Sequence, residues 1–438
     1  MADKYIINGG NQLKGEVLIG GAKNSVLKLM AAAILAKGET KIYNVPELTD
    51  VGIMLEVING LGVKTDYDKV EQSIRIDATD ITSITAKYEY VSKMRASFTI
   101  LGALVARCKE AIVALPGGCA IGERRVDFHI KGLEALGAKI KIENGYVHAK
   151  APKLVGTDIY LDIPSVGATE NLMLASIMAE GSTRIQNAAQ EPEIIDLANF
   201  LNTMGADIVG AGTSEIVING VKQEDLHPIE YTTIPDRIEA GTFMSMVAGT
   251  KGKAIIRNVY PAHLTFFTDK LIKMGANIKL VEPTAIEVSC KNRLNSVNFV
   301  TQPYPGFPTD LQSMAMVLLS VSNGVGIITE SLYENRFMQV QHLLRMGADI
   351  HQDRNHAIIK GVKKLTGAIV EASDLRAGAS LVVAGLMATG TTEIYKLHHI
   401  DRGYEKFDEK IKNLGGNIVR VHDISSDELK VGVNEPSV

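Results

Sequence analysis

The sequence has few cysteines, no long apolar run and little net charge. Its three cysteines, Cys108, Cys119 and Cys290, follow no metal-ligand spacing, so we expect no metal site and a reducing compartment. No apolar run reaches the roughly 18 residues that a membrane span needs, and the N-terminus lacks a secretion-signal pattern. The net charge of −4 argues against a nucleic-acid-binding protein. These absences together predict a cytoplasmic protein with no membrane or nucleic-acid partner.

A short pattern recurs six times along the 438 residues, at intervals of 68 to 75 residues. Each copy has an apolar helical spacing, a glycine and then a strand-like segment, as in "ALGAKI" and "KMGANI". The glycine suits the left-handed position that ends a helix. The six glycines are Gly62, Gly137, Gly205, Gly275, Gly347 and Gly415.

Each repeat also contains a second, more apolar helix. Because these helices are apolar nearly all round, we expect them at domain centres. They span residues 24–35, 94–106, 169–179, 237–248, 310–321 and 375–388. The pattern predicts an α/β protein of two domains with three units each, divided near residues 227–239. The first strand, "KYIINGG", is expected to pair within the last domain.

Charged and polar residues gather where these central helices begin. Because a helix N-terminus favours anions, facing helix starts from two domains would form a cleft for an anionic ligand. Simpler interpretations stay open for each residue: an N-cap for the aspartates, a surface position for the arginines and a solvated loop for the lysine. The residues are Lys23, Asn24, Arg95, Asp236, Asp310, Asp374 and Arg376.

Cys119 lies in the glycine-rich stretch "ALPGGCAIGERRVDFHI", which is typical of a mobile loop. Arg124 and Arg125 nearby would favour its thiolate or prepare the thiol for proton transfer. Cys108 and Cys290 fit the alternative of buried, inert cysteines. The composition therefore favours a chemical role for Cys119.

Eight motifs in order, from residue 4 to about residue 420, resemble the UDP-N-acetylglucosamine 1-carboxyvinyltransferases of the enolpyruvyl transferase family. They are "GGAKN", the Cys119 stretch, "PSVGATEN", "PDRIEAGTF", "FPTDLQ", "YENRFMQV", "SDLRAGA" and "HIDRGYE". The resemblance implies two inverse α/β barrels with pseudo-threefold symmetry. The first would span residues 22–230 and the second residues 1–21 and 231–424, followed by a tail over 425–438.

The resemblance also implies the reaction. Enolpyruvyl would pass from phosphoenolpyruvate to the 3′-hydroxyl of UDP-N-acetylglucosamine, with release of phosphate, in the first committed step of peptidoglycan precursor synthesis. Cys119 would be the general acid and target of the epoxide fosfomycin, and Asp310 would be the base. A loop carrying Arg124 would close over the site. No cofactor or metal is implied, and the oligomeric state is not indicated.

The family's binding residues map onto the following positions. The implied phosphoenolpyruvate contacts are Lys23, Asn24, Arg124 and Arg402. The implied sugar-nucleotide contacts are Asn24, Arg95, Arg124, Arg125, Val126, Asp127, Phe128, Ser165, Val166, Gly167, Asp310 and Leu332. Arg376, Glu334 and Arg336 would support the cleft. Arg125 departs from the family, which often has proline there.

Three other interpretations remain. A shikimate 3-phosphate enolpyruvyl transferase would share the architecture, but Cys119 and the "PSVGATEN" turn belong to the sugar-nucleotide branch. A catalytically silent sugar-nucleotide-binding protein would not be expected to keep Lys23, Cys119, Asp310 and Arg402 together. A cysteine hydrolase would need His129 as the partner of Cys119 and a third group that does not stand out.

Overall fold

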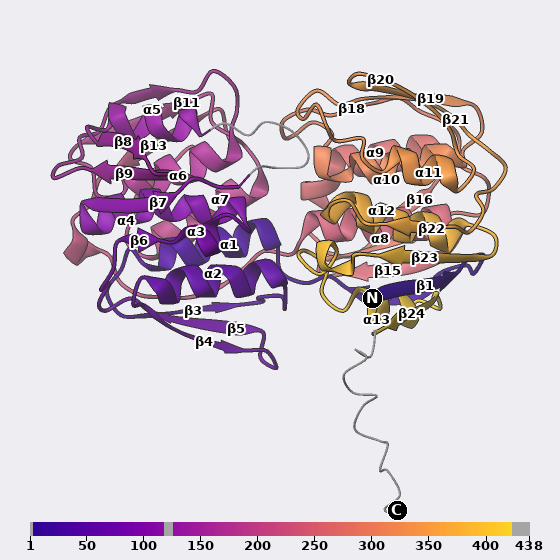
Figure 1. The fold of residues 1–438 in the computed structure, drawn as a ribbon, viewed down its shortest axis with the longest axis horizontal. Helices are drawn as coiled ribbons and strands as arrows, with labels where there is room; N and C mark the ends of the chain where they lie inside the picture. Colours follow the sequence, from indigo (N-terminus) through magenta and orange to yellow (C-terminus); the bar gives the residue numbers. More distant parts are fainter. Residues whose placement is uncertain (1–2, 118–125, 423–438) are drawn as a thin grey trace, which may run out of the picture.

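The structure is a computed structural model that describes residues 3–117 and 126–422. Cys119, Arg124, Arg125 and the tail over 425–438 lie outside the described residues. Two α/β domains lie side by side in Figure 1. One hydrophobic core draws on residues 26–226, and the other draws on residues 5–19 and 238–418. These cores support the predicted domain boundaries, which stay a prediction.

The described residues contain six four-stranded mixed sheets of one pattern, and each repeat supplies at least three strands of its sheet. The first two strands of each sheet pair in parallel, and the remaining neighbours pair antiparallel. The first domain has β14(Glu230–Thr232)-β3(Glu39–Tyr43)-β5(Ser73–Asp77)-β4(Lys64–Asp68), β6(Thr85–Ala86)-β7(Glu110–Ala114)-β9(Tyr146–Lys150)-β8(Lys139–Glu143) and β10(Asp158–Tyr160)-β11(Ser182–Gln186)-β13(Glu215–Asn219)-β12(Asp207–Val209). The second has β2(Lys14–Leu18)-β15(Lys253–Arg257)-β17(Ala285–Ser289)-β16(Asn277–Glu282), β18(Phe299–Val300)-β19(Val325–Thr329)-β21(His356–Lys360)-β20(Asp349–Asp353) and β22(Ile369–Glu371)-β23(Thr391–Tyr395)-β1(Lys4–Asn8)-β24(Asn417–Val421).

The two N-terminal strands complete sheets of the second domain. β1 pairs antiparallel with both β23 and β24, which confirms the prediction for the first strand. β2 pairs in parallel with β15. The chain therefore starts in the second domain, crosses to build the first, and returns after β14.

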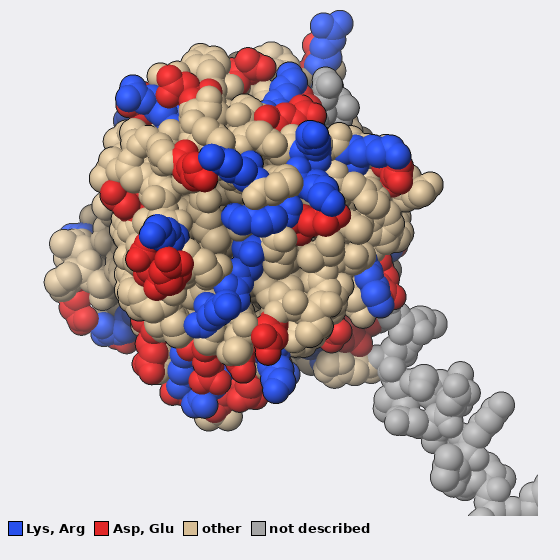
Figure 2. Space-filling model, turned by 90° about the vertical axis from the view of Figure 1, so that its left-hand side faces the viewer, with Lys and Arg blue, Asp and Glu red and all other residues tan. Residues whose placement is uncertain are grey.

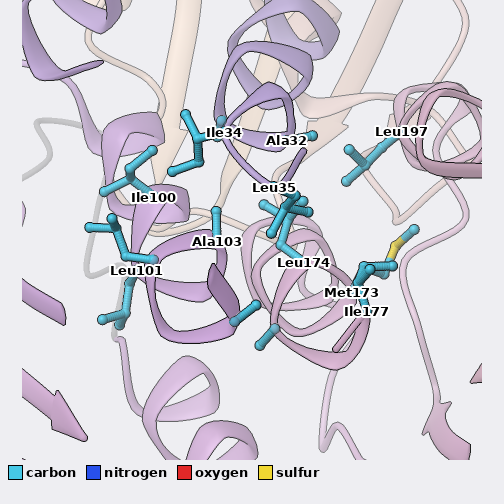
Figure 3. Close-up of a cluster of buried hydrophobic side chains, with 14 of the residues drawn as sticks. Ala32, Ile34, Leu35, Ile100, Leu101, Ala103, Met173, Leu174, Ile177 and Leu197 are labelled. Carbon is cyan, nitrogen blue, oxygen red and sulfur yellow. The ribbon is translucent and has the colours of Figure 1, made fainter. Parts of the chain in front are cut away.

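Three apolar helices form the centre of each domain, as the repeats predict. They are α1(Lys23–Ala33), α4(Ile100–Cys108) and α6(Val166–Ser176) in the first domain, and α8(Arg237–Gly249), α10(Gln312–Ser320) and α12(Leu375–Met387) in the second. Short 3₁₀ turns, η1(Arg95–Thr99) and η4(Thr309–Leu311), lead into α4 and α10. Figure 3 shows part of the first core, where Leu35, Leu101 and Leu174 come from three different units. Burial of these faces supplies most of the favourable free energy of folding.

The outer helices carry the repeated glycine. They are α2(Thr49–Gly60), α5(Asp127–Ala135), α7(Pro192–Thr203), α9(Thr265–Met274), α11(Val340–Arg345) and α13(Phe407–Asn413). The glycine just after each has φ between 83° and 110°, so its predicted left-handed conformation is confirmed in all six repeats. The remaining short helices are α3(Tyr88–Val91), η2(Gln223–Asp225), η3(Pro261–Leu264) and η5(Leu397–His399). Within the described ranges, no helix has the length and apolar character needed to cross a membrane.

Candidate active site

The start of α1 meets the start of α8 at the junction of the two domains, and one buried carboxylate joins cations from both sides. Asp50, in the first turn of α2, binds Lys23 Nζ through Oδ2 (2.7 Å) and Arg402 Nε through Oδ1 (2.8 Å). Lys23 is the first residue of α1, and Arg402 follows η5 of the second domain. The Asp50 side chain is 1% exposed, whereas that of Arg402 is 34% exposed. Asp50 therefore lies beneath the cations and holds them together.

Electrostatics make this junction a suitable place for an anion. Burial lowers the pKa of Lys23, and Arg376 and Arg402 lower it further, while Asp50 opposes the shift. Burial also works against the charge of Asp50, but Lys23 and Arg402 outweigh it and lower the pKa of that carboxyl group. An incoming carboxylate or phosphate would add negative charge where cations predominate.

A second cluster surrounds Asp310 in η4 of the second domain. Arg336 Nη2 donates to Asp310 Oδ1, and Arg376 Nη2 donates to Oδ2 (3.1 Å). Arg376 Nη1 also donates to Tyr404 Oη (3.3 Å), which shares a hydrogen bond with Thr242 (2.8 Å). Burial lowers the pKa of Arg376, but Asp310 and Tyr404 outweigh that effect and raise it. Arg376 therefore stays charged and fixes the Asp310 carboxylate.

The three aspartates that the sequence could place as N-caps divide into two kinds. Asp236 and Asp374 cap α8 and α12 by accepting hydrogen bonds from backbone N–H groups. Asp310 is not the cap of α10, whose N-cap position is Leu311. Its carboxylate is turned to the guanidinium groups instead, so the capping interpretation is wrong for this residue.

Other simple interpretations also fail. Lys23 is a buried helical residue rather than part of a solvated loop, and Arg376 is 5% exposed rather than on the surface. Arg95 begins η1 and is half-buried. Asp236 additionally accepts the backbone N–H of Lys23 through Oδ2 (3.2 Å), which joins a second-domain cap to the start of α1.

The residues expected to contact the sugar nucleotide lie mainly at helix starts of the first domain. Ser165 caps α6 by accepting from Ala168 N–H (3.4 Å), so Val166 and Gly167 form its first turn. Val126 is the N-cap residue of α5, and Asp127 and Phe128 begin that helix. Asn24 lies in the first turn of α1. From the second domain, Leu332 is 37% exposed and Glu334 is exposed. The binding roles of these residues stay predictions.

His129 does not suit the role of a general base. It is 6% exposed, its Nδ1 lies 2.8 Å from the Asn171 amide, and burial with Arg95 and Lys28 nearby lowers its pKa to about 3. A base this weak argues against a Cys–His hydrolase. Among the described residues, no group of three His, Cys, Asp or Glu side chains is placed to hold a metal ion.

The site includes residues that sequence reasoning missed. Asp50 reads as an ordinary acidic residue of a first helical turn, and Tyr404 stands in the motif "HIDRGYE" without a role of its own. A further pair, Arg237 with Glu193 (3.0 Å), also joins the two domains. Arg402 reaches Asp50, and Arg237 reaches Glu193, only because the domains dock. The partners of Tyr404 lie within the second domain.

Comparison with known proteins identifies the family. The family model of EPSP synthase (3-phosphoshikimate 1-carboxyvinyltransferase) matches residues 7–411. The UDP-N-acetylglucosamine 1-carboxyvinyltransferase 2 of Carboxydothermus hydrogenoformans is 52% identical over 422 residues, covering 96% of this chain and 100% of the relative. The UDP-N-acetylglucosamine 1-carboxyvinyltransferase of Desulfosudis oleivorans is also 52% identical, over 419 residues, 96% of this chain and 99% of the relative.

Solved structures support the fold. The enolpyruvyl transferase NikO from Streptomyces tendae has a TM-score of 0.88 at 25% identity, covering 97% of this chain and all of that one. EPSP synthase from Acinetobacter baumannii has a TM-score of 0.73 at 19% identity, covering 96% and 100%, and shows the fold alone. The chain therefore belongs to the EPSP synthase family of carboxyvinyltransferases, which confirms the resemblance read from the motifs.

Proposed function

We propose that the protein transfers enolpyruvyl from phosphoenolpyruvate to the 3′-hydroxyl of UDP-N-acetylglucosamine, in the cytoplasm, as the first committed step of peptidoglycan precursor synthesis. The names of relatives that are 52% identical over 96% of the chain support this substrate pair. The observation that carries the chemistry is the convergence of Lys23 and Arg402, from two domains, on the single carboxylate of Asp50. Two cations brought together in this way suit a substrate with both phosphate and carboxylate groups.

The residues divide the work as follows. Lys23 and Arg402 hold the anionic groups of phosphoenolpyruvate. Asp310 takes the proton of the sugar 3′-hydroxyl as the hydroxyl oxygen bonds to C2 of phosphoenolpyruvate. Cys119 gives a proton to C3 of phosphoenolpyruvate, and a tetrahedral intermediate results. Loss of a proton from C3 and cleavage of the C2–O bond to phosphate then leave the enol ether and free phosphate. Arg336 and Arg376 keep the Asp310 carboxylate in place.

Phosphate release distinguishes the branches of the family. The purified protein is given phosphoenolpyruvate with either UDP-N-acetylglucosamine or shikimate 3-phosphate. We expect phosphate only with the sugar nucleotide. Release only with shikimate 3-phosphate would instead indicate a 3-phosphoshikimate 1-carboxyvinyltransferase, the enzyme that gives the matching family model its description. Release with neither, while the sugar nucleotide still raises the Tm, would indicate a silent binding protein.

The three thiols give an independent test of the general acid. We expect fosfomycin to form one adduct, on Cys119, faster when UDP-N-acetylglucosamine is present. Burial raises the pKa of Cys108 and Cys290, so both stay protonated and react slowly. Peptide mass mapping reads out the labelled residue, and equal labelling of all three would contradict special activation of Cys119. Cys119→Asp should keep part of the activity and lose fosfomycin sensitivity, because a carboxylic acid can also donate a proton.

A further inference from the structure

A second charged site lies at the far end of the first domain. A pocket of about 550 Å³ opens where α1, α4 and α6 end, and its lining includes Lys37, Arg107, Lys109, Glu180, Lys222 and Gln223. Because α1 begins at the domain junction, the pocket lies at the opposite ends of the helices whose starts form the candidate active site. Figure 2 views the molecule from the side of the first domain, and Lys and Arg side chains, with Asp and Glu side chains beside them, gather near the middle of that face.

The pocket carries a marked excess of positive charge. Four cationic side chains line it against one carboxylate, Glu180, which leaves a formal charge of 4 − 1 = +3. Glu180 is itself bound to Lys153 (2.6 Å), a residue outside the lining. Lys37 forms no ion pair with any residue that the structure describes, and Lys222 approaches Glu224 only at 3.9 Å. Asp80 opposes the lowering of the pKa of Arg107, so the acidic neighbours neutralise the pocket only in part.

Helix ends explain part of this charge. Lys109 Nζ donates to Ala106 O (3.0 Å), Arg107 Nη2 to Ala78 O (3.2 Å) and Gln223 Nε2 to Leu35 O (2.8 Å). Such contacts satisfy carbonyl groups that have no partner within a helix. They use one donor from each side chain, whereas a lysine has three N–H donors and an arginine five.

In the second domain, the carbonyl groups at the end of a central helix are bound by one side chain. At the end of α10, the single guanidinium of Arg293 donates to the carbonyl oxygens of Val321, Ser322, Gly361 and Val362 at 2.7 to 3.1 Å. One cation is therefore enough to satisfy four carbonyls there. Hydrogen bonds to the carbonyl groups at helix ends therefore do not explain why four cations surround an open pocket. Burial lowers the pKa of Arg107 and Lys109, which indicates that both charges are partly desolvated.

We propose that this pocket binds a small phosphorylated metabolite that carries at least two negative charges. Its volume falls within the roughly 300–1,000 Å³ of small-molecule pockets, and lysine and arginine donors suit phosphate oxygens. The described lining contains apolar groups such as Met178 and Val221 but no aromatic ring, so phosphate rather than a stacked base is the group recognised. This inference does not depend on the proposed reaction.

The test needs a local readout, because the candidate active site is also cationic. Met178 lines the pocket, so its methyl signal in a ¹³C-methyl-methionine NMR spectrum, assigned with Met178→Leu, reports binding there. Inorganic pyrophosphate is the probe. We expect a saturable shift of the Met178 signal and a Kd that rises at least about tenfold in Lys37→Gln/Lys222→Gln.

The control removes the same charge elsewhere. Lys363→Gln/Lys364→Gln changes two exposed lysines of the second domain, and its Kd should stay within about twofold of the original. A Met178 signal that does not move with pyrophosphate would overturn the proposal. Equal weakening in the two double variants would also overturn it, since that result indicates general attraction by the surface rather than a site.

Discussion

Two aspartates at equivalent places in the second domain have different tasks. Asp310 binds two arginines, whereas Asp374 accepts the N–H groups of Arg376 and Ala377 at the start of α12. Asp310→Asn should lower kcat by about 10²- to 10⁴-fold because an amide cannot take the hydroxyl proton. Asp374→Asn keeps a capping oxygen and should leave kcat nearly unchanged. Phosphate release rates measure both, and an unaltered kcat in Asp310→Asn would exclude its role as base.

His129 makes stability depend on pH. Its folded pKa of about 3 lies below the unfolded value of 6.5, so the unfolded chain binds a proton that the folded chain does not as the pH falls. The stability gained by keeping His129 uncharged is fully present above pH 6.5 and is lost as the pH falls toward 3. Between pH 7 and pH 5, protonation of this histidine in the unfolded chain should lower the unfolding free energy by about 2 kcal/mol.

Denaturant unfolding at the two pH values tests this effect. His129→Asn keeps an oxygen near the position of Nδ1 and should show a smaller loss on going from pH 7 to pH 5 than the original protein. Any packing lost beside Phe98 appears at both pH values and cancels in that difference. An identical pH dependence in the variant would show that His129 is protonated in the folded state.

At the scale of elements, α1 and α6 are joined by a buried ion pair between Lys28 and Glu170. Glu170 is fully buried, its Oε1 has no hydrogen-bond partner among the described residues, and burial raises its pKa to about 7. Lys28→Met should therefore lower the unfolding free energy by about 3–5 kcal/mol at pH 8, because Glu170 then must either keep an unpaired buried charge or take up a proton. The loss should be smaller at pH 5 than at pH 8, since protonation removes that charge.

Replacing both partners distinguishes the cost of an unpaired buried charge from the contribution of the ion pair itself. Lys28→Met/Glu170→Leu should recover most of the stability, because apolar residues suit the surrounding core. Lys273→Met, which removes an exposed partner of Asp269 on α9, should have little effect. If the double variant is no more stable than Lys28→Met alone, the pair contributes more than the neutralisation of a buried charge.

Periodicity explains why the elements could be predicted so well. The central helices follow from continuous apolar segments, and the six glycines mark helix ends that the structure confirms. Individual side-chain contacts were harder to predict from the sequence. Asp236, Asp310 and Asp374 all precede helices, and only backbone geometry decides which carboxylate turns inward to cap. Asp50 was missed because its partners come from residues 27 and 352 positions away.

At the scale of the molecule, side chains from both domains meet at one junction. Arg402 binds Asp50, Arg237 binds Glu193, and Gln72 donates to both oxygens of Glu405 at 3.1 Å. These contacts bring Lys23 at the start of α1 close to second-domain cations. The proposed contacts to phosphoenolpyruvate and the alignment of the domains therefore draw on the same set of charges.

Two variants separate these contributions. Asp50→Asn removes the carboxylate that orients Lys23 and Arg402, so we expect the KM for phosphoenolpyruvate to rise about tenfold, equivalent to about 1.4 kcal/mol. Glu193→Gln breaks another buried pair between the domains without touching these cations, and should lower the Tm with little change in KM. Steady-state kinetics with thermal unfolding give both quantities. A similar rise of KM in both variants would mean that Asp50 acts through domain alignment rather than by positioning the two cations, because only alignment is common to the two pairs.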